Sequence, residues 1–153
     1  MTRTLLVAFG LLVLASAVAV GPLGVVSQDT RVSDSASVTL ESAPADTITL
    51  ERGRFGSGRY HVEAPPVVVT AGDVAGTPTL RYVVDIPGAW LTVTSRYELA
   101  GRQGRLRMGL NPTTVSPDRI DQDSYDAIVA VWLRTGDRER ALVQRQVTVE
   151  VRP

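Results

Sequence analysis

The sequence predicts a small all-β domain built as a two-sheet sandwich, preceded by one apolar N-terminal helix. Three observations carry this prediction. Apolar and polar residues alternate along most of the chain after residue 46, and a period of two gives a strand one inward and one wet face. Gly and Pro residues separate these stretches at short intervals, as turns do. No segment after the N-terminal one has the 3.6-residue period of an amphipathic helix.

The N-terminal segment, residues 1–28, is predicted to target or anchor the chain. Its apolar run Leu5–Val26 lies between two isolated charges, Arg3 and Asp29. A helix rises about 1.5 Å per residue, so such a run can cross a hydrocarbon core of about 30 Å. A positive charge before the run keeps that end in the cytoplasm. We therefore expect a single-pass protein of the cell membrane, with its C-terminal domain outside.

A cleaved signal peptide is the alternative for the same segment. Arg3 would be its charged start and Leu5–Leu14 its apolar stretch. Ala15-Ser16-Ala17 or Ala17-Val18-Ala19 would be its small-residue cleavage site. The protein would then be secreted, and the rest of the chain is extracytoplasmic under either hypothesis.

Residues 29–46 are predicted to be a polar tether, and residues 47–153 the β-sandwich domain. The tether is rich in small polar residues, with Val38 and Leu40 as a possible first edge strand.

Most strands expected in the first part of the domain have one apolar face, and Val67 to Val69 form a short continuous apolar run. In chain order these faces are Ile48 and Leu50; Tyr60 and Val62; Val67 to Val69; Leu80, Tyr82, Val84 and Ile86; Leu91, Val93 and Tyr97; and Leu106, Met108 and Leu110. Turn residues separate the later strands at Pro87-Gly88, at 100–104 and at Asn111-Pro112. Many short strands with regular turn signals favour a sandwich over a barrel or an α/β fold.

The C-terminal third predicts a long hairpin. The segment from Tyr125 to Leu133 is apolar on both faces, which is typical of a central strand. Thr135 to Arg138 supply the turn, and a return strand follows whose inward face is Val143, Val147, Val149 and Val151.

The entry to this hairpin carries a resemblance. Asp123-Ser124-Tyr125-Asp126-Ala127, followed by an apolar strand, resembles the start of the F strand of immunoglobulin-like domains. There a tyrosine hydroxyl bonds back to the preceding loop as a tyrosine corner, two residues before a cysteine. Ala127 stands at the cysteine position, so the disulfide is missing. The whole layout resembles small exported, membrane-anchored immunoglobulin-like proteins of halophilic archaea, although the charge is less acidic than is usual there. The resemblance implies no activity.

Composition argues against several functions. The sixteen basic residues, all Arg, balance sixteen acidic ones without a basic cluster, which argues against nucleic acid as a partner. Cysteine is absent and His61 is the one histidine, so thiol chemistry is excluded and a histidine-based metal site or triad has little to draw on. We expect no cofactor and no enzymatic activity.

Four acidic residues form the candidate metal site: Asp118, Asp121, Asp123 and Asp126. Clustered carboxylates suit calcium, but the EF-hand glycine and final glutamate are missing. The alternative is a solvated loop whose Asp residues cap turns together with Ser116 and Pro117.

Other candidates are interpreted as structural. His61 is expected at the surface. Trp90 and Trp132 are expected to pack in the core or on a strand face, and the alternative is that they are exposed aromatic residues that bind a partner. The glycine-rich segment 52–58 is expected to be a hairpin loop.

The predicted function is a non-enzymatic, membrane-anchored module that contacts another protein of the cell envelope or a surface layer. The alternative is a secreted or anchored domain that binds calcium or another ligand through the Asp118–Asp126 loop.

Overall fold

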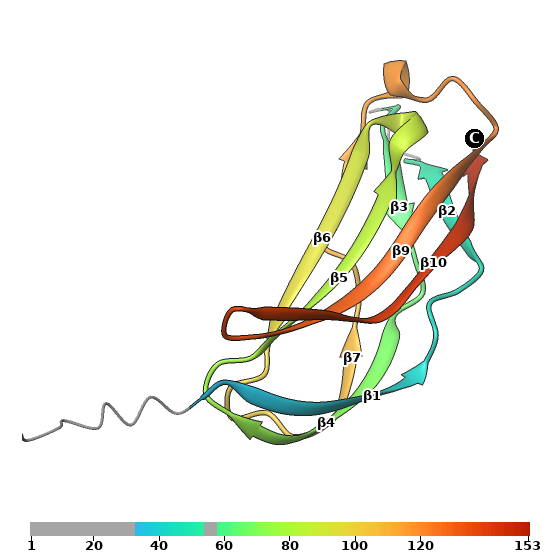
Figure 1. The fold of residues 1–153 in the computed structure, drawn as a ribbon. Helices are drawn as coiled ribbons and strands as arrows, with labels where there is room; N and C mark the ends of the chain where they lie inside the picture. The colour runs from blue at the N-terminus through green and yellow to red at the C-terminus, as the bar shows by residue number, and fades with distance from the viewer. Residues whose placement is uncertain (1–32, 54–57) are drawn as a thin grey trace, which may run out of the picture. The chain divides into compact units, whose positions relative to one another are not determined.

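The computed structural model describes residues 33–53 and 58–153, which belong to a compact unit of residues 32–153. Within these ranges the secondary structure consists of β-strands and two short 3-10 helices (Figure 1). The predicted all-β class is therefore confirmed. The predicted N-terminal helix lies outside the described residues. No helix in the described ranges is long and apolar enough to span a membrane.

The strands form two sheets (Figure 1). The smaller sheet has three strands in the order β1-β4-β7, all antiparallel: β1 (Ser35–Ser42), β4 (Val67–Ala75) and β7 (Gly104–Met108).

The larger sheet has seven strands in the order β6-β5-β9-β10-β2-β3-β8. They are β6 (Leu91–Glu98), β5 (Thr79–Ile86), β9 (Ser124–Thr135), β10 (Arg138–Arg152), β2 (Thr47–Arg52), β3 (Tyr60–Glu63) and β8 (Thr114–Val115). The pair of β10 and β2 is parallel, and the other pairs are antiparallel. The predicted central position of β9 is confirmed, since it lies between β5 and β10.

The chain changes sheets twice near its start. β1 and β2 belong to different sheets, as do β3 and β4, although each pair is separated by only a few residues. Pro44 lies in the first connection, and Pro65 and Pro66 in the second. A proline cannot donate to a β-ladder, so each connection ends one ladder before the next begins.

The core lies between the two sheets and consists of the inward rows of the strands together with Leu99, which follows β6. Its largest fully buried side chains are Tyr82, Ile48, Leu50, Leu80, Ile86, Leu99, Met108, Leu133, Val67, Val69, Val84 and Val129. Full burial of one such aliphatic side chain contributes about 1.5–3 kcal/mol. This core, with no disulfide anywhere in the chain, stabilises the fold.

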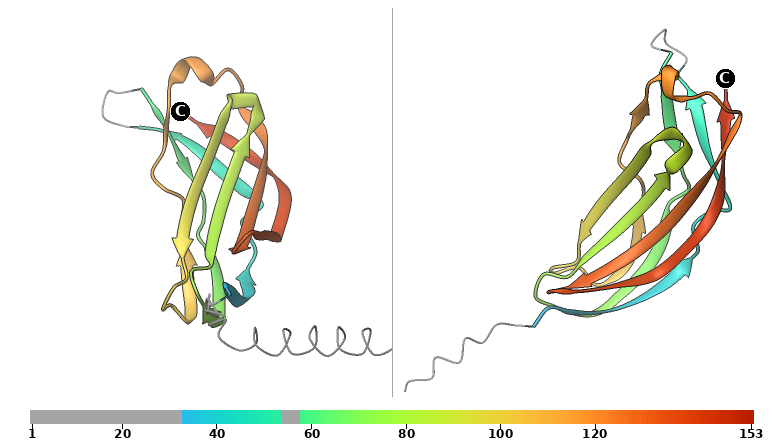
Figure 2. Two further views of the ribbon diagram at one scale, coloured as in Figure 1. Left: turned by 60° about the vertical axis from the view of Figure 1, so that its left-hand side comes forward. Right: turned by 45° about the horizontal axis from the view of Figure 1, so that its top comes forward.

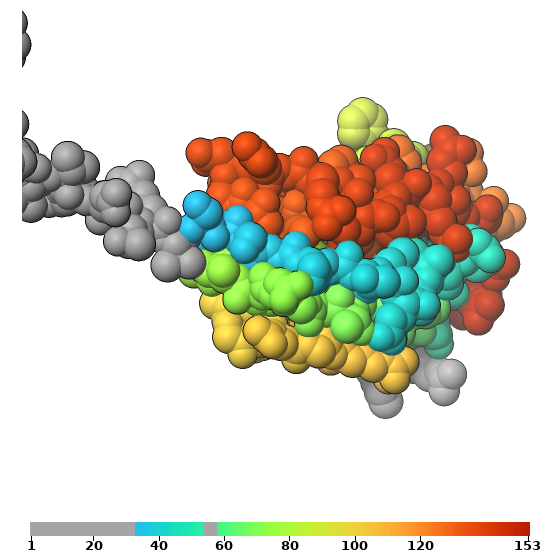
Figure 3. Space-filling view, turned by 60° about the horizontal axis from the view of Figure 1, so that its bottom comes forward, coloured from blue at the N-terminus to red at the C-terminus, as the bar shows by residue number. Residues whose placement is uncertain are grey.

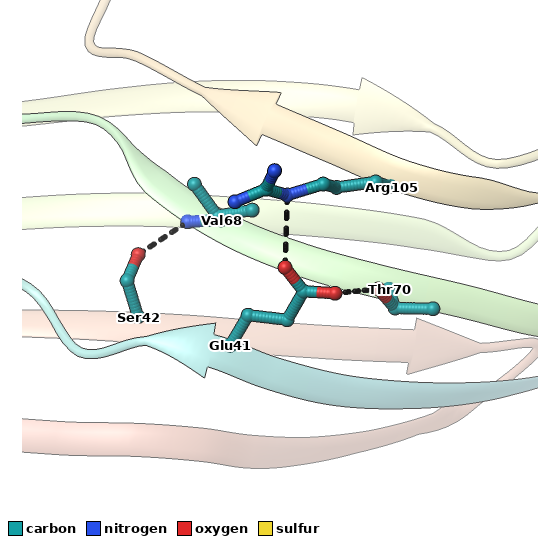
Figure 4. Close-up of polar contacts among 5 residues, drawn as sticks. All are labelled: Glu41, Ser42, Val68, Thr70 and Arg105. Atoms are coloured by element: carbon teal, nitrogen blue, oxygen red, sulfur yellow. Dashed lines mark hydrogen bonds and ion pairs between the residues drawn. The ribbon is translucent and has the colours of Figure 1, made fainter.

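The start of the domain differs from the sequence prediction. The predicted tether, residues 29–46, contains the complete strand β1, which runs along β4 at the surface with β7 beyond it (Figure 3). The carboxylate of Glu41 pairs with Arg105 Nε at 2.9 Å and accepts a bond from the Thr70 hydroxyl (Figure 4). Ser42 Oγ accepts the Val68 N–H at 2.9 Å, where a register shift interrupts the ladder. The possible first edge strand through Val38 and Leu40 is therefore confirmed as β1, and the domain begins before Thr47.

Candidate functional site

Trp90 is the most conspicuous side chain of the domain, because 87% of its surface is exposed. It follows the 3-10 helix η1 (Pro87–Ala89) in the turn from β5 to β6. Its backbone is left-handed, with φ 50° and ψ 44°, and its N–H donates to Pro87 O at 3.0 Å. The prediction that Trp90 packs in the core or on a strand face is wrong. The inward row of β6 begins one residue later, at Leu91, and the left-handed turn residue lies outside the strand alternation.

A buried tyrosine packs against this turn from the side of the core. Tyr125, at the start of β9, is 4% exposed, and Gly88 lies directly on its ring. A Cβ added at Gly88 would lie 2.8 Å from Tyr125 Cδ1. The turn that carries Trp90 is therefore in close contact with the core.

The Tyr125 hydroxyl is fixed by three hydrogen bonds. It accepts the N–H groups of Asp121 at 2.9 Å and Gln122 at 3.1 Å, and it donates to Asp121 Oδ1 at 3.0 Å. A buried ring whose hydroxyl bonds to the preceding loop is the tyrosine-corner geometry that the sequence predicted.

A second turn lies beside the first at the same end of the domain (Figure 2). This is the 3-10 helix η2 (Pro117–Arg119), from which Arg119 Nη1 donates to the Trp90 carbonyl oxygen at 3.5 Å. A hydrogen bond from Ser116 lowers the pKa of Asp118 in this turn. We call residues 87–90 and 117–119 the Trp90 tip.

The four predicted metal ligands occupy different structural positions, and all are exposed. Asp118 lies on η2, the Asp121 carboxylate accepts the Tyr125 hydroxyl, and Asp126 lies on β9 opposite Thr148. The carbonyl of Asp123 accepts the Val151 N–H at 2.9 Å. No three His, Asp or Glu side chains in the described ranges form a group suited to a metal ion. Calcium binding stays a prediction, which thermal unfolding with and without millimolar Ca²⁺ would test.

The remaining candidates also have definite places. His61 is exposed on β3, as predicted, and lies opposite Thr114 of β8. Trp132 is half-buried on the outer face of β9. The middle of the glycine-rich segment, residues 54–57, lies outside the described residues.

A surface groove of about 700 Å³ lies where the chain passes from β3 to β4. Its lining contains one carboxylate and one guanidinium, but no histidine and no hydroxyl nucleophile. The lining residues are Val62, Glu63, Ala64, Pro65, Pro66, Arg107, Gly109 and Leu110. Glu63 and Arg107 are thus the ionisable residues of this groove.

Comparison with known proteins adds little to this geometry. No protein-family model and no curated protein matches the chain. Among solved structures, the CooA pilin subunit from enterotoxigenic Escherichia coli is similar, with 12% identity and a TM-score of 0.40. The match covers 77% of this chain and 99% of the pilin chain, and a likeness this weak carries no argument about function.

Proposed function

We propose that this protein is a non-enzymatic, extracytoplasmic module of immunoglobulin-like kind that binds another protein of the cell envelope through the Trp90 tip. The observation that carries the proposal is an exposed tryptophan held in a left-handed backbone conformation on a well-supported turn.

The immunoglobulin-like assignment has two supports. The strands β5, β9 and β10 form one sheet, opposite β4 and β7 in the other, as the C, F and G strands lie opposite B and E in immunoglobulin domains. The tyrosine corner at the start of β9 occurs at the place where such domains have it.

Trp90 adds little to the stability of the domain. Its ring contributes little burial, and a left-handed conformation costs an L-residue about 1–2 kcal/mol. Asp73 is the other non-glycine residue with positive φ in the described ranges, but aspartate adopts this conformation far more readily. Strain that the fold does not require occurs mainly at functional positions, and tryptophan is enriched among residues that dominate protein–protein binding.

The position of the tip fits an anchored binding module. The described chain begins at the opposite end of β5, where Asp34 accepts the N–H groups of Thr77 at 2.8 Å and Gly136 at 3.2 Å. A domain anchored through its N-terminal segment would therefore present the Trp90 tip away from the membrane. This orientation rests on the predicted anchor.

The test compares partner binding with stability. A photoreactive aromatic residue at position 90 of the full-length protein, in membranes of the cells that produce it, should cross-link to one envelope protein. The same probe at Thr39, on the outer face of β1, is the control and should not. Trp90→Gly should abolish recovery of that partner while leaving the free energy of unfolding unchanged or higher by up to about 1 kcal/mol. Unchanged recovery with Trp90→Gly would refute the Trp90 tip as the binding site.

A further inference from the structure

The outer face of the larger sheet carries a short apolar stripe. Its members are Val83 of β5 and Ile128, Ala130 and Trp132 of β9, in the outward rows of two adjacent strands. Val83, Ile128 and Trp132 are half-buried by their neighbours, and Ala130 is 4% exposed. The smaller sheet packs on the inner face of the larger sheet, where the hydrophobic core lies. We call the surface that carries the stripe the outer face.

Charged residues lie at the two ends of this stripe, and the two ends differ in sign. On β9 the outward row reads Asp126, Ile128, Ala130, Trp132, Arg134, with both charged residues exposed. On β5 it reads Arg81, Val83, Asp85. Because the strands are antiparallel, Asp85 lies opposite Ile128 and Arg81 lies opposite Trp132. The acidic residues of both strands therefore lie at one end and the basic residues at the other.

The neighbouring strands weaken this polarity without reversing it. On β6, Arg96 lies opposite Arg81 and Thr92 opposite Asp85, and the exposed Glu98 lies opposite Thr79 at the basic end. On β10, Gln144 and Gln146 lie opposite Ala130 and Ile128, so the rim beside the stripe is uncharged there. Glu139 pairs with Arg81 at 2.7 Å at the basic end, so three basic residues, Arg81, Arg96 and Arg134, lie there with two acidic ones.

The two rows also share one centre. Ala130 is the midpoint between Asp126 and Arg134, Val83 is the midpoint between Arg81 and Asp85, and these two midpoints are register partners. Consider a two-fold axis that lies in the plane of the interface, runs perpendicular to the strands and passes over this pair. Rotation about this axis places the apolar stripe of one copy over the apolar stripe of the other. It also places each acidic end over a basic end. A surface complementary to itself under a two-fold rotation is the requirement for an isologous dimer.

We propose that the outer face binds a second copy of this chain, with the strands of the two copies antiparallel. Asp126 of one copy then faces Arg134 of the other, and Ala130 lies near the axis in both. Two sheets pack face to face about 10 Å apart. In such a pair the apolar stripe supplies the dry centre and the charges select the orientation. The Trp90 tip lies outside this surface, and the proposal is independent of the one above.

The antiparallel arrangement has a geometric consequence. The two copies begin at opposite ends of the pair, because each chain enters its domain beside the basic end, near Asp34. Two chains anchored in facing membranes can form this dimer, whereas two chains in one membrane would have to turn one domain over.

Charge exchange tests the proposal. In sedimentation velocity of the full-length protein in detergent micelles, wild type should dimerise. Asp126→Arg and Arg134→Asp alone should each raise the dimer dissociation constant at least about tenfold, because like charges then face each other. The double variant should return it to within about threefold of wild type, because the pair is restored with its signs exchanged. Arg107→Asp, at an exposed position of β7 in the smaller sheet, is the matched control and should have no effect.

Disulfide formation tests the orientation in the same protein, which has no cysteine of its own. Gln146 and Ala141 are exposed on β10, on either side of the central level. A mixture of the Gln146→Cys and Ala141→Cys proteins should form a mixed disulfide dimer faster than either protein forms one alone. A monomeric wild type, single charge variants that dimerise like wild type, or faster pairing of like with like would each overturn the proposal.

Discussion

At the scale of single residues, tyrosine hydroxyls join the larger sheet to the segments that pass between the sheets. Tyr97 of β6 donates to the Gly109 carbonyl at 2.6 Å, and Tyr82 of β5 donates to the Pro65 carbonyl at 3.4 Å. Both acceptors lie where the chain leaves one sheet for the other. Tyr125 makes the corresponding bond to the loop between β8 and β9, two strands of the larger sheet. Each ring packs against the core, and its hydroxyl holds a connecting segment that has no β-ladder hydrogen bonds.

Removal of these hydroxyls should show their contribution directly. Tyr125→Phe leaves two N–H groups without their acceptor, and we expect a loss of about 1–2 kcal/mol in the free energy of unfolding. The sequence places Tyr97 in the middle of a strand and predicts that Tyr97→Phe has a smaller effect than Tyr125→Phe. The short hydrogen bond to Gly109 in the structure predicts instead that Tyr97→Phe lowers the free energy of unfolding by a similar amount. Tyr125→Ala also removes the ring and should cost about 3–5 kcal/mol.

Denaturant unfolding of the three variants is the measurement. A neutral Tyr125→Phe would mean that the corner does not stabilise the domain, and the sheet order alone would then support the immunoglobulin-like assignment.

Tyr82 predicts a stability change at high pH. Burial raises the pKa of its phenol from 10.0 to about 12. The unfolded chain loses this proton near pH 10, whereas the folded chain keeps it until about pH 12, so the contribution is intact below pH 10 and is lost as the pH rises to 12. The loss should be roughly 1–3 kcal/mol. The free energy of unfolding of Tyr82→Phe should fall less steeply with pH than that of wild type when it is measured by denaturant titration between pH 9 and pH 12. Equal dependence on pH in the two proteins would contradict the prediction.

Trp90 shows what residue types alone do not reveal. Hydrophobicity correctly predicted that Val93 and Tyr125 are buried. In a strand the alternation of side chains fixes which residues face the core. A turn residue has no such constraint, and the positive φ that directs Trp90 outward is not encoded in the alternation. Ser95 is a polar residue that the alternation of β6 places in the core. Its hydroxyl accepts the Asn111 N–H at 2.6 Å, and this hydrogen bond compensates for its burial.

At the scale of elements, the start of β1 is fixed by a single carboxylate. Asp34 Oδ1 accepts the Thr77 N–H of the β4–β5 turn, and Asp34 Oδ2 accepts the Gly136 N–H of the β9–β10 turn. The preceding turn residue, Gly76, has φ +71° and lies directly against Asp34. Contacts from two sheets thus converge on the first residues of the domain.

Gly76→Ala should therefore be more destabilising than a glycine replacement of the same backbone type. A Cβ at Gly76 would lie 2.1 Å from Asp34 Oδ1 and 3.0 Å from Asp34 Cα, whereas Gly101, with φ +68°, has open space at that position. Gly101→Ala should cost about 1–2 kcal/mol for the left-handed conformation alone. Gly76→Ala should cost about 1–3 kcal/mol more, because Asp34 must move. Similar losses for the two variants in thermal unfolding would show that the Asp34 contacts are weak.

The strands were predictable to the extent that they alternate. Alternation located β2, β3, β5, β6, β9 and β10, and it located part of β4 and β7. It missed β8, whose two residues are too short for a period. It indicated β1 only as a possible edge strand through Val38 and Leu40 within a tether, because the inward residues of β1 are small or only half-buried. The parallel pairing of β2 with β10 joins segments about a hundred residues apart. No local pattern specifies such a pair, because it depends on how the intervening sheet is arranged.

At the scale of the whole molecule, folding separates one candidate site whose residues are close in sequence and brings together two others whose residues are not. The acidic residues are clustered in sequence, but folding places them on a 3-10 helix, a loop and a strand, and it uses Asp121 for the tyrosine corner. The Trp90 tip and the outer face are assembled from residues distant in sequence. Neither could be recognised before the register of β5, β6 and β9 was known.

The topology of the chain in its membrane is the last prediction. The charge-free stretch from Thr4 to Gln28 behind Arg3 should keep the protein in the membrane fraction, with the β-domain outside. The chain has no cysteine, so single substitutions can report each side. In intact cells Thr39→Cys should react with a membrane-impermeant maleimide, because Thr39 is exposed on β1, whereas Thr2→Cys should react only after lysis. A mature protein beginning near Val18 or Val20 by intact mass would establish the secreted alternative instead. Full-length protein in the cytosolic fraction, with Thr39→Cys unlabelled in intact cells, would exclude both locations and with them a role for the Trp90 tip outside the membrane.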